Sequence, residues 1–310
     1  MVRRSHLIET PGRIPQSRPN LIGFATLARL AYYRGDPLID QAVKGFGWGE
    51  GAWTIPATPL EPQVLSLDYD DYKIIVFEGT TTSAQTWEYC TSPLNVAVGV
   101  FPGKILQGFY SVFQTVWPKV EALLQDIGKR KVVFIGHSLG AAMAALSSYQ
   151  WEKYSKENFH CCVTFGCPRI GNGEWVHGLD FAWYRVSNDI DPVTHVPPRT
   201  LLIGNPFSGA DWWKIIEYDH GGYAISLDSE GNIKNGTAPS LGLADLFAAL
   251  GQNNWSTSQL AEPHGMDDYV FNLSKTPGPF RYWRHKYFSE VNNELNEREF
   301  LEWRMLGFND

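Results

Sequence analysis

The strongest constraint on the fold is residues 131–150, "KVVFIGHSLGAAMAALSSYQ", where an apolar run, a Gly-His-Ser-Leu-Gly pentad and an alanine-rich segment follow one another without a break. The apolar run is typical of a fully buried strand, and the alanine-rich segment predicts a helix. A serine on the sharp turn between such elements has its hydroxyl exposed above the sheet. We therefore predict that Ser138 is a nucleophile rather than a turn serine in a chance pentad. Positions 136 and 140 are expected to need a residue as small as glycine, because the strand and the helix approach closely there.

Strand patterns also occur in "VLSLDYD", "YKIIVFEG", "CVTFG", "WYRVS", "KIIEYD" and "YAISLD". The first two segments predict one hairpin, and the last two predict another around His220. Helix patterns occur at residues 21–33 and in "GFYSVFQTVWPKVEALLQDIG", which Pro118 must start, kink or split. Because strands alternate with helices, we expect an α/β fold with a mostly parallel sheet covered on both faces. No linker divides the series, so we expect one domain over residues 1–310, ending in a charged helical tail at 281–310.

Composition and charge exclude several classes of protein. Hydrophobic residues make up 44% and charged residues 19% of the chain, values that suggest neither disorder nor a membrane-spanning protein. The net charge is −7 and no basic run is long, so we expect no nucleic-acid partner. The N-terminus reaches Pro11 and Pro15 before any apolar stretch of signal-peptide length. We therefore expect a cytoplasmic protein, with other export routes left open.

Three of the four cysteines lie in one apolar stretch, "HCCVTFGCP". Adjacent side chains of a strand point to opposite faces, so Cys161, Cys162 and Cys167 are expected to be buried free thiols and not a disulfide framework. Their spacing lacks the second Cys or His pair of a metal site. This pattern favours a reducing compartment.

The pentad and two further motifs resemble a known family. "IGHSLGAAMAAL" is preceded by "FEGTTT" at residues 77–82 and followed by "TFGCPRIGN" at residues 164–172. In this order they resemble the class 3 lipases, the fungal-type triacylglycerol lipases, over about residues 64–275. The resemblance implies an α/β-hydrolase fold with a lid segment. It also implies ester hydrolysis by a serine, aspartate and histidine triad without a metal or organic cofactor.

The acid of such a triad follows the serine in the chain and precedes the histidine. Asp189 and Asp191 both follow a predicted buried strand, in "NDIDPVTHVPP". The family has an aspartate a few residues before a Val-Pro-Pro run, which implies Asp191 and leaves Asp189 as the runner-up. The alternative interpretation is that either carboxylate only caps the loop as an Asx-turn.

The histidine that the resemblance implies is His264, which opens "HGMDDYVFNL" before a short amphipathic helix. This segment resembles the family's His-x-x-x-Tyr stretch with one extra residue before Tyr269. His195 shares a loop with the acid, and His220 is expected to pack in its hairpin. We expect His264 to act as the general base and the acid to orient it. The alternative is that His264 only caps the start of a helix.

Two backbone donors are expected to stabilise the tetrahedral intermediate. Leu139 supplies one N–H because it directly follows the nucleophile. The resemblance implies Thr80 for the second donor, in a loop where Glu78 replaces the usual arginine of the family. We expect this replacement to alter packing without removing the oxyanion hole.

The resemblance places a lid near residues 84–103. Trp87, Tyr89, Val98 and Phe101 offer an apolar surface suited to a lipid or an acyl chain. The alternation in "NVAVGVF" equally fits an ordinary strand with one buried face.

These observations predict a serine carboxylic-ester hydrolase that cleaves medium- or long-chain acylglycerol esters through an acyl-enzyme. The expected partner is a lipid or other ester substrate, met at a transient lipid interface. The alternatives are an esterase for short or aromatic (feruloyl-type) esters, a phospholipase A1, and a catalytically silent binding module with the same fold.

Overall fold

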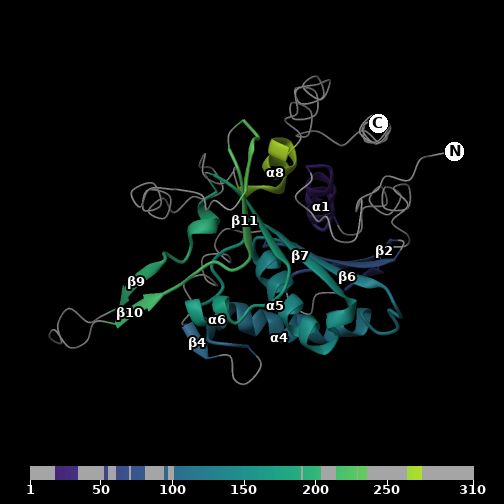
Figure 1. Cartoon of the computed structure of the whole chain (residues 1–310), viewed down its shortest axis with the longest axis horizontal. Helices are drawn as coiled ribbons and strands as arrows, with labels where there is room; N and C mark the ends of the chain where they lie inside the picture. The colour runs from purple at the N-terminus through teal and green to yellow at the C-terminus, as the bar shows by residue number, and fades with distance from the viewer. Residues whose placement is uncertain are drawn as a thin grey trace.

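A sheet of eight strands separates two layers of helices (Figure 1). The computed structural model describes residues 18–33, 52–54, 61–69, 71–80, 94–96, 101–189, 191–203, 214–228, 230–235 and 264–273. In sheet order the strands are β1 (Ala52–Trp53), β2 (Val64–Tyr69), β3 (Tyr72–Phe77), β6 (Lys131–His137), β7 (Phe159–Phe165), β8 (Trp183–Asn188), β11 (Tyr223–Leu227) and β12 (Ile233–Asn235). Neighbours from β3 to β11 are parallel, and the pairs at the two edges are antiparallel. The predicted mostly parallel sheet is confirmed.

The helices lie on both faces of this sheet, as predicted (Figure 1). They are α1 (Arg18–Leu30), α4 (Gln107–Leu123), α5 (Leu139–Tyr154), α6 (Gly173–His177) and α8 (Met266–Leu273), with the 3-10 helices η1 (Lys156–Asn158) and η2 (Pro192–His195). The α1 and α8 helices cover one face, and α4, α5 and α6 cover the other. No described helix is long and apolar enough to cross a membrane.

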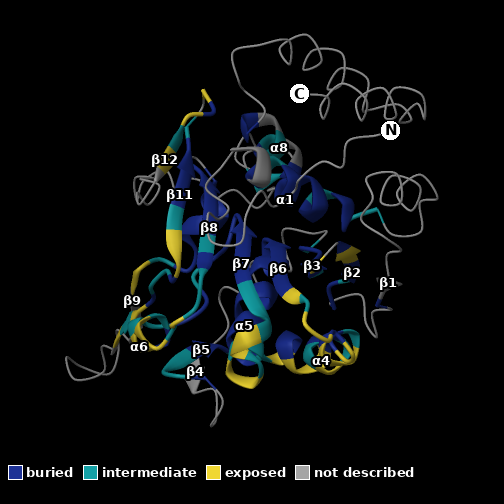
Figure 2. Ribbon diagram, turned by 45° about the vertical axis from the view of Figure 1, so that its right-hand side comes forward, coloured by how far each residue is buried: buried dark blue, intermediate teal, exposed yellow. Residues whose placement is uncertain are grey.

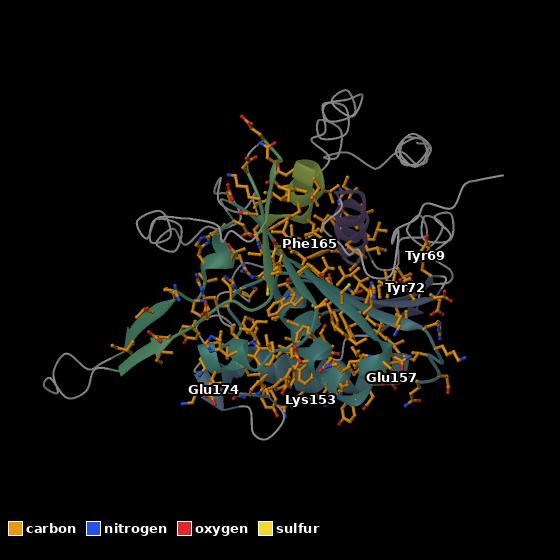
Figure 3. All side chains as sticks on the ribbon, viewed as in Figure 1. Tyr69, Tyr72, Lys153, Glu157, Phe165 and Glu174 are labelled. Carbon is orange, nitrogen blue, oxygen red and sulfur yellow. The ribbon has the colours of Figure 1, made fainter. Side chains whose placement is uncertain are left out.

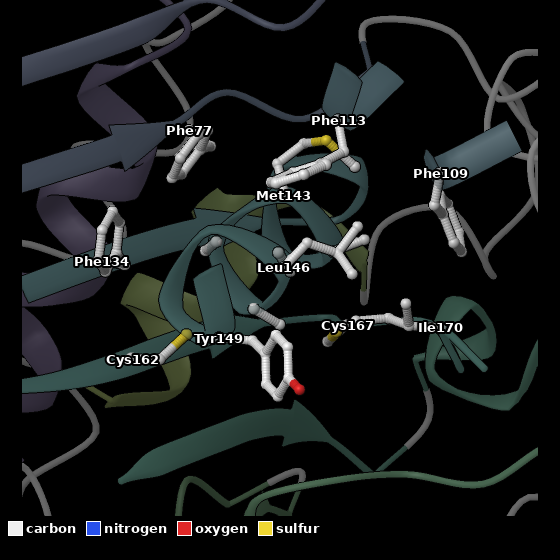
Figure 4. Packing of buried hydrophobic residues seen from close by; sticks show 14 of the residues in the cluster. Phe77, Phe109, Phe113, Phe134, Met143, Leu146, Tyr149, Cys162, Cys167 and Ile170 are labelled. Atoms are coloured by element: carbon white, nitrogen blue, oxygen red, sulfur yellow. The ribbon is translucent and has the colours of Figure 1, made fainter. Parts of the chain in front are cut away.

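The central strands β6 and β7 are apolar over most of their length because each face of the sheet belongs to a separate hydrophobic cluster. In β6, Val132 and Phe134 pack with α4 and α5, whereas Val133 and Ile135 pack with α1 and α8. Alternation of side chains along a strand produces this division, and Figure 2 shows β6 and β7 buried over most of their length. Figure 4 shows the cluster on the α5 side, including Met143. A strand covered on both faces therefore appears in the sequence as a continuous apolar run.

The adjacent cysteines of β7 follow the same rule. Cys161 lies in the cluster with α1 and α8, and Cys162 lies in the cluster with α4 and α5. Both are buried free thiols, as is Cys167. The expectation for these cysteines is confirmed. In Figure 3, Phe165 at the end of β7 lies near the middle of the molecule, whereas Lys153 and Glu157 lie at its periphery.

The predicted hairpin of "VLSLDYD" with "YKIIVFEG" is confirmed, because β2 pairs with β3 in antiparallel register. The hairpin predicted around His220 is wrong. Strand β10 (Lys214–Glu217) instead pairs with β9 (Thr200–Ile203), and β11 joins β8 in parallel. A Cβ on Gly221 would lie 2.5 Å from Trp183 of β8, so the chain crosses close to β8 there and enters the main sheet. The two-residue alternation predicts a strand but does not select its partner.

The α4 helix continues through Pro118, so this proline neither starts nor ends it. The apolar face of α4 is buried on both sides of the proline, at Phe109, Val112, Phe113, Val116 and Val120. This packing outweighs the loss of one backbone hydrogen bond. The charged tail at residues 281–310 lies outside the described residues.

The turn from β6 into α5 is tight enough to require glycine at two positions. A Cβ on Gly136 would lie 2.1 Å from the carbonyl oxygen of Gly140. A Cβ on Gly140 would lie 2.4 Å from the carbonyl oxygens of both Phe77 and Glu78. The close approach of strand and helix predicted from the pentad is confirmed, and it also includes the end of β3.

We predict that Gly140→Ala lowers the free energy of unfolding by about 2–3 kcal/mol, because the new methyl group displaces backbone rather than a flexible side chain. Gly173→Ala is the matched control, since its Cβ would meet nothing nearer than 3.8 Å. Guanidinium unfolding of the two variants checks this prediction. Equal stabilities would show that the β6–α5 turn tolerates a methyl group.

Candidate active site

Ser138 occupies a strained turn between β6 and α5. Its φ of 55° and ψ of −122° lie in a region that residues other than glycine rarely adopt. Its backbone N–H donates to the carbonyl of Phe165 at 3.1 Å, which links the turn to the end of β7. The Ser138 side chain is buried and not exposed as the sequence suggests, and its Oγ has no hydrogen-bond partner among the described residues. The strained backbone therefore places a hydroxyl that makes no described hydrogen bond at the carboxyl edge of the parallel strands.

Asp191 follows β8 at the same edge of the sheet and is fully buried. Its Oδ2 accepts a hydrogen bond from Tyr269 Oη at 2.6 Å, and its Oδ1 accepts one from the Val193 N–H at 2.8 Å. His264 Nδ1 lies 3.0 Å from Oδ2. Burial alone would raise the pKa of this carboxyl, but the nearby His264 and these hydrogen bonds outweigh burial and lower it. Asp191 is therefore an ionised carboxylate at neutral pH.

The contact with Asp191 determines the proton arrangement on His264. A carboxylate only accepts hydrogen bonds, so His264 Nδ1 is the protonated nitrogen. In the neutral ring, Nε2 then carries the lone pair that a general base needs. The His264 side chain is 18% exposed, whereas that of Asp191 is 0% exposed. The pair thus extends from a buried carboxylate to an imidazole that solvent can reach.

Gly166 makes room for this pair directly after β7. A Cβ at Gly166, whose φ is +56°, would lie 2.8 Å from Asp191 Oδ2 and 2.9 Å from His264 Nδ1. Only glycine fits such a position. Because the Phe165 carbonyl accepts the backbone hydrogen bond of Ser138, Gly166 also places the Asp191–His264 pair beside the Ser138 turn. The sequence analysis did not identify Gly166 as the residue that leaves space for this pair, although a glycine directly after a predicted buried strand could have indicated it.

His137, the second residue of the pentad, was also missed. It is buried, and its ring centroid lies 4.6 Å from that of His264. His137 Nε2 lies 2.6 Å from the backbone carbonyl of His264, and Nδ1 lies 2.6 Å from Tyr32 Oη. Burial, and next the neighbouring His264, lower the pKa of His137 to about 3. His137 occupies a variable position of the Gly-x-Ser-x-Gly pattern, so the pattern does not predict its contacts.

Leu139 and Thr80 both lie close to the Ser138 turn. Leu139 is the first residue of α5, where helix N–H groups have no partner within the helix. Thr80 follows Gly79, whose Cβ would lie 3.0 Å from Ser138 Cβ, so this loop passes directly over the turn. Glu78 is buried and accepts a hydrogen bond from the Gln63 N–H at 3.2 Å. The loop that carries Thr80 is thus attached to the segment before β2.

The other titratable candidates make different contacts. Asp189 accepts a hydrogen bond from Ser226 Oγ at 2.6 Å and pairs with Lys234. His195 Nδ1 lies 3.0 Å from Thr194 Oγ1, and His220 Nε2 donates to the Thr194 carbonyl at 2.6 Å. Asp191 also caps η2, because its side chain accepts a hydrogen bond from the Val193 N–H. The same carboxylate therefore both forms an Asx-turn and pairs with His264. Within the described ranges, no three His, Cys, Asp or Glu residues gather as metal ligands.

The expected lid is described only in part. Trp87, Tyr89 and Val98 lie outside the described residues. Phe101 is buried in the core, with its ring centroid 5.3 Å from that of Phe113 and 5.4 Å from that of Trp175. Phe101 was expected on an apolar surface open to substrate, and this expectation is wrong. Strand β4 (Leu94–Val96) pairs with β5 (Lys104–Leu106), which fits the ordinary-strand interpretation for that part of the segment.

Comparison with known proteins finds a family profile that is similar to the middle of the chain. The sequence profile described as Lipase (class 3) matches residues 74–201. The secreted mono- and diacylglycerol lipase MDL5 of Malassezia globosa is 32% identical over 142 residues, which cover 39% of this chain and 45% of that protein. The secreted mono- and diacylglycerol lipase LIP4 of Malassezia restricta is 29% identical over 153 residues, covering 44% and 51%. The chain thus spans about half the length of the curated relatives it matches.

The fold is that of a solved fungal lipase. The triacylglyceride lipase of Rhizomucor miehei superposes with a TM-score of 0.59 at 18% sequence identity, covering 78% of this chain and 91% of that chain. At this identity the likeness shows the fold alone, and it confirms the predicted α/β-hydrolase fold.

The expectation of a cytoplasmic protein is wrong, because the relatives are named as secreted lipases. The cysteine argument fails for a physical reason. Cys161, Cys162 and Cys167 are buried, and burial raises the pKa of each thiol. Thiols that are neither accessible nor ionised stay reduced in either compartment, so they do not report where the protein resides.

We predict that acid destabilises the protein partly through His137. Its folded-state pKa of about 3 lies below the ordinary value of 6.5, so the unfolded chain binds more protons than the folded chain between these values. This contribution to stability is complete above pH 6.5 and is lost as the pH falls towards 3. From pH 7 to pH 5, the free energy of unfolding should fall by about 2 kcal/mol more for the native protein than for His137→Gln. Guanidinium titrations at the two pH values measure the difference, and equal falls would contradict the prediction.

Proposed function

We propose that this chain is a class 3 lipase, as the profile match over residues 74–201 supports, and that it hydrolyses carboxylic esters through a covalent acyl-enzyme. The observation that carries the proposal is the contact of His264 Nδ1 with the buried carboxylate of Asp191. It lies beside a serine held on a strained strand-to-helix turn. Nucleophile, base and orienting acid thus come from three separate loops at one edge of the sheet.

In the proposed acylation step, His264 Nε2 removes the proton of Ser138 Oγ as that oxygen attacks the ester carbonyl carbon. The tetrahedral intermediate collapses, and the histidine returns the proton to the departing alcohol oxygen. Water then attacks the acyl carbon and gives a proton to the same nitrogen. The bond between that carbon and Ser138 Oγ breaks, the histidine returns the proton to Ser138 Oγ, and the carboxylic acid leaves. Asp191 stays ionised and stabilises the imidazolium that forms in each step. Since Ser138 Oγ has no partner among the described residues, it turns towards His264 without breaking a described bond.

We propose that the backbone N–H groups of Leu139 and Thr80 receive the oxyanion. Leu139 fits this role because its N–H lies at the positive end of the α5 dipole. Thr80 fits because its loop passes over the Ser138 turn. Each such donor contributes on the order of 3 kcal/mol to transition-state stabilisation in enzymes where one has been removed.

The substrates that we propose are acylglycerol esters with medium or long acyl chains. Two curated relatives are named as mono- and diacylglycerol lipases, and both are named as secreted, which supports an extracellular enzyme acting on lipid. We also propose that the chain is a single α/β-hydrolase domain, because strands β2, β3, β6, β7 and β8 of the one sheet each contribute side chains to both hydrophobic clusters.

The first test compares Ser138→Ala with Ser147→Ala on p-nitrophenyl esters of increasing acyl length. Ser147 is the matched control because its hydroxyl is also buried and has no partner among the described residues. Ser138→Ala should lower kcat at least about 10³-fold, because it removes the nucleophile. Ser147→Ala should leave kcat within about twofold of the native value.

A rate that peaks at long chains supports a lipase, and a peak at short chains would indicate an esterase. Absence of hydrolysis by the folded native protein, with detergent present, would contradict the proposed function and favour a binding module.

The second test separates the two candidate acids. Asp191→Asn removes the charge that orients and stabilises His264, and kcat should fall on the order of 10³–10⁴-fold, as expected for loss of a triad carboxylate. Asp189→Asn should change kcat by less than about threefold, because Asp189 contacts Ser226 and Lys234 instead. Steady-state kinetics of both variants decide the assignment. A larger loss in Asp189→Asn would reverse it.

A further inference from the structure

The residues after α1 reach the candidate active site, although they precede the segment that matches the lipase family. Tyr32 follows α1, and its hydroxyl lies 2.6 Å from His137 Nδ1. The His137 ring in turn lies 2.6 Å from the backbone carbonyl of His264. Two short contacts thus connect the N-terminal helix to the backbone of the proposed general base.

Chemistry fixes the direction of each hydrogen bond. The His264 carbonyl can only accept, so His137 Nε2 is the donor. The neutral imidazole then has a lone pair on Nδ1, so Tyr32 Oη donates its proton there. The buried position of His137 supports the neutral ring, because a buried imidazolium would need a compensating charge.

The same hydroxyl also contacts the loop on the other side of the nucleophile. Tyr32 Oη lies 2.1 Å from the position of a Cβ at Gly79, so only glycine leaves space for it. The backbone of Gly79 therefore lies against this hydroxyl. Gly79 precedes Thr80, the proposed oxyanion donor. Tyr32 therefore joins the loop of the proposed oxyanion hole to the backbone of the proposed base.

These contacts supply a constraint that the Asp191 pairing lacks. The carboxylate fixes Nδ1 of His264, but a ring held at one nitrogen can still pivot with its backbone. The His137 donor fixes that backbone at the carbonyl, just before α8 begins. Fixing both the backbone and Nδ1 determines where Nε2 points, and small displacements of a reacting group lower rates strongly.

We propose that Tyr32 and His137 are positioning residues of this hydrolase, holding the His264 backbone and the Gly79–Thr80 loop in register with Ser138. The inference rests on the proposed function. Because these residues act on the reacting groups and not on the bound acyl chain, their loss should lower kcat and leave KM nearly unchanged.

The experiment compares Tyr32→Phe with Tyr33→Phe, which removes a hydroxyl from the next residue. Rates are expressed per active site titrated with a phosphonate, so that misfolded protein does not count. Tyr32→Phe should lower kcat about tenfold, with KM within about twofold, which corresponds to one lost hydrogen bond. Tyr33→Phe should match the native enzyme. The double variant Tyr32→Phe/His137→Gln should be no slower than His137→Gln alone, because the two residues act as one unit.

A second readout does not depend on hydrolysis. The ¹⁵N resonances of His137 should show a neutral ring protonated on Nε2 from pH 5 to pH 8, and the Nδ1 resonance should shift in Tyr32→Phe. A ring protonated on Nδ1, or on both nitrogens, would overturn the proposal. An unchanged kcat in Tyr32→Phe, when Ser138→Ala is inactive, would overturn it while the proposed function stands. A native protein without hydrolysis would overturn both.

Discussion

The buried carboxylate of Asp191 is the interaction on which the arrangement of the candidate site depends. A fully buried charge is costly unless its oxygens are satisfied. Here the donors come from three places: His264 two residues before α8, the α8 helix itself and the first turn of η2. Satisfying the charge therefore requires α8 to dock against the loop that follows β8. The same requirement places His264 beside the Ser138 turn, so one set of contacts both satisfies the buried charge and fixes the position of the proposed base.

The rest of the site follows from the parallel sheet. Parallel strands end at a common edge, and Ser138, Gly166 and Asp191 follow β6, β7 and β8, three neighbouring strands. The side chains of these strands fill two separate hydrophobic clusters, which makes the sheet a rigid support for the loops. Glycines stand where backbone or the reacting groups come closest, at Gly136, Gly140 and Gly166. The sheet supplies rigidity, and the small residues supply the space that the reacting groups occupy.

Much of this could be predicted because it is local in the sequence. The strand, the pentad and the alanine-rich helix are contiguous, so Ser138 and its two glycines followed directly from one stretch of residues. Asp191 and His264 required the resemblance to a family, because spacing alone left Asp189 open. Other features depend on distant contacts: Tyr32 meets His137 across 105 positions, and β11 selects β8 rather than the nearer β10. Phe101 was misjudged because an apolar side chain has the same sequence signal in a core and on a lipid-facing surface.

Reaction of the native protein with a fluorophosphonate, followed by mass spectrometry of its peptides, tests the central claim most directly. The reagent forms a covalent bond only with a serine that a neighbouring base activates. The account predicts one adduct per chain, on Ser138 within the peptide that spans β6 and α5. An adduct on a different serine, or none on the folded protein with detergent present, would contradict it.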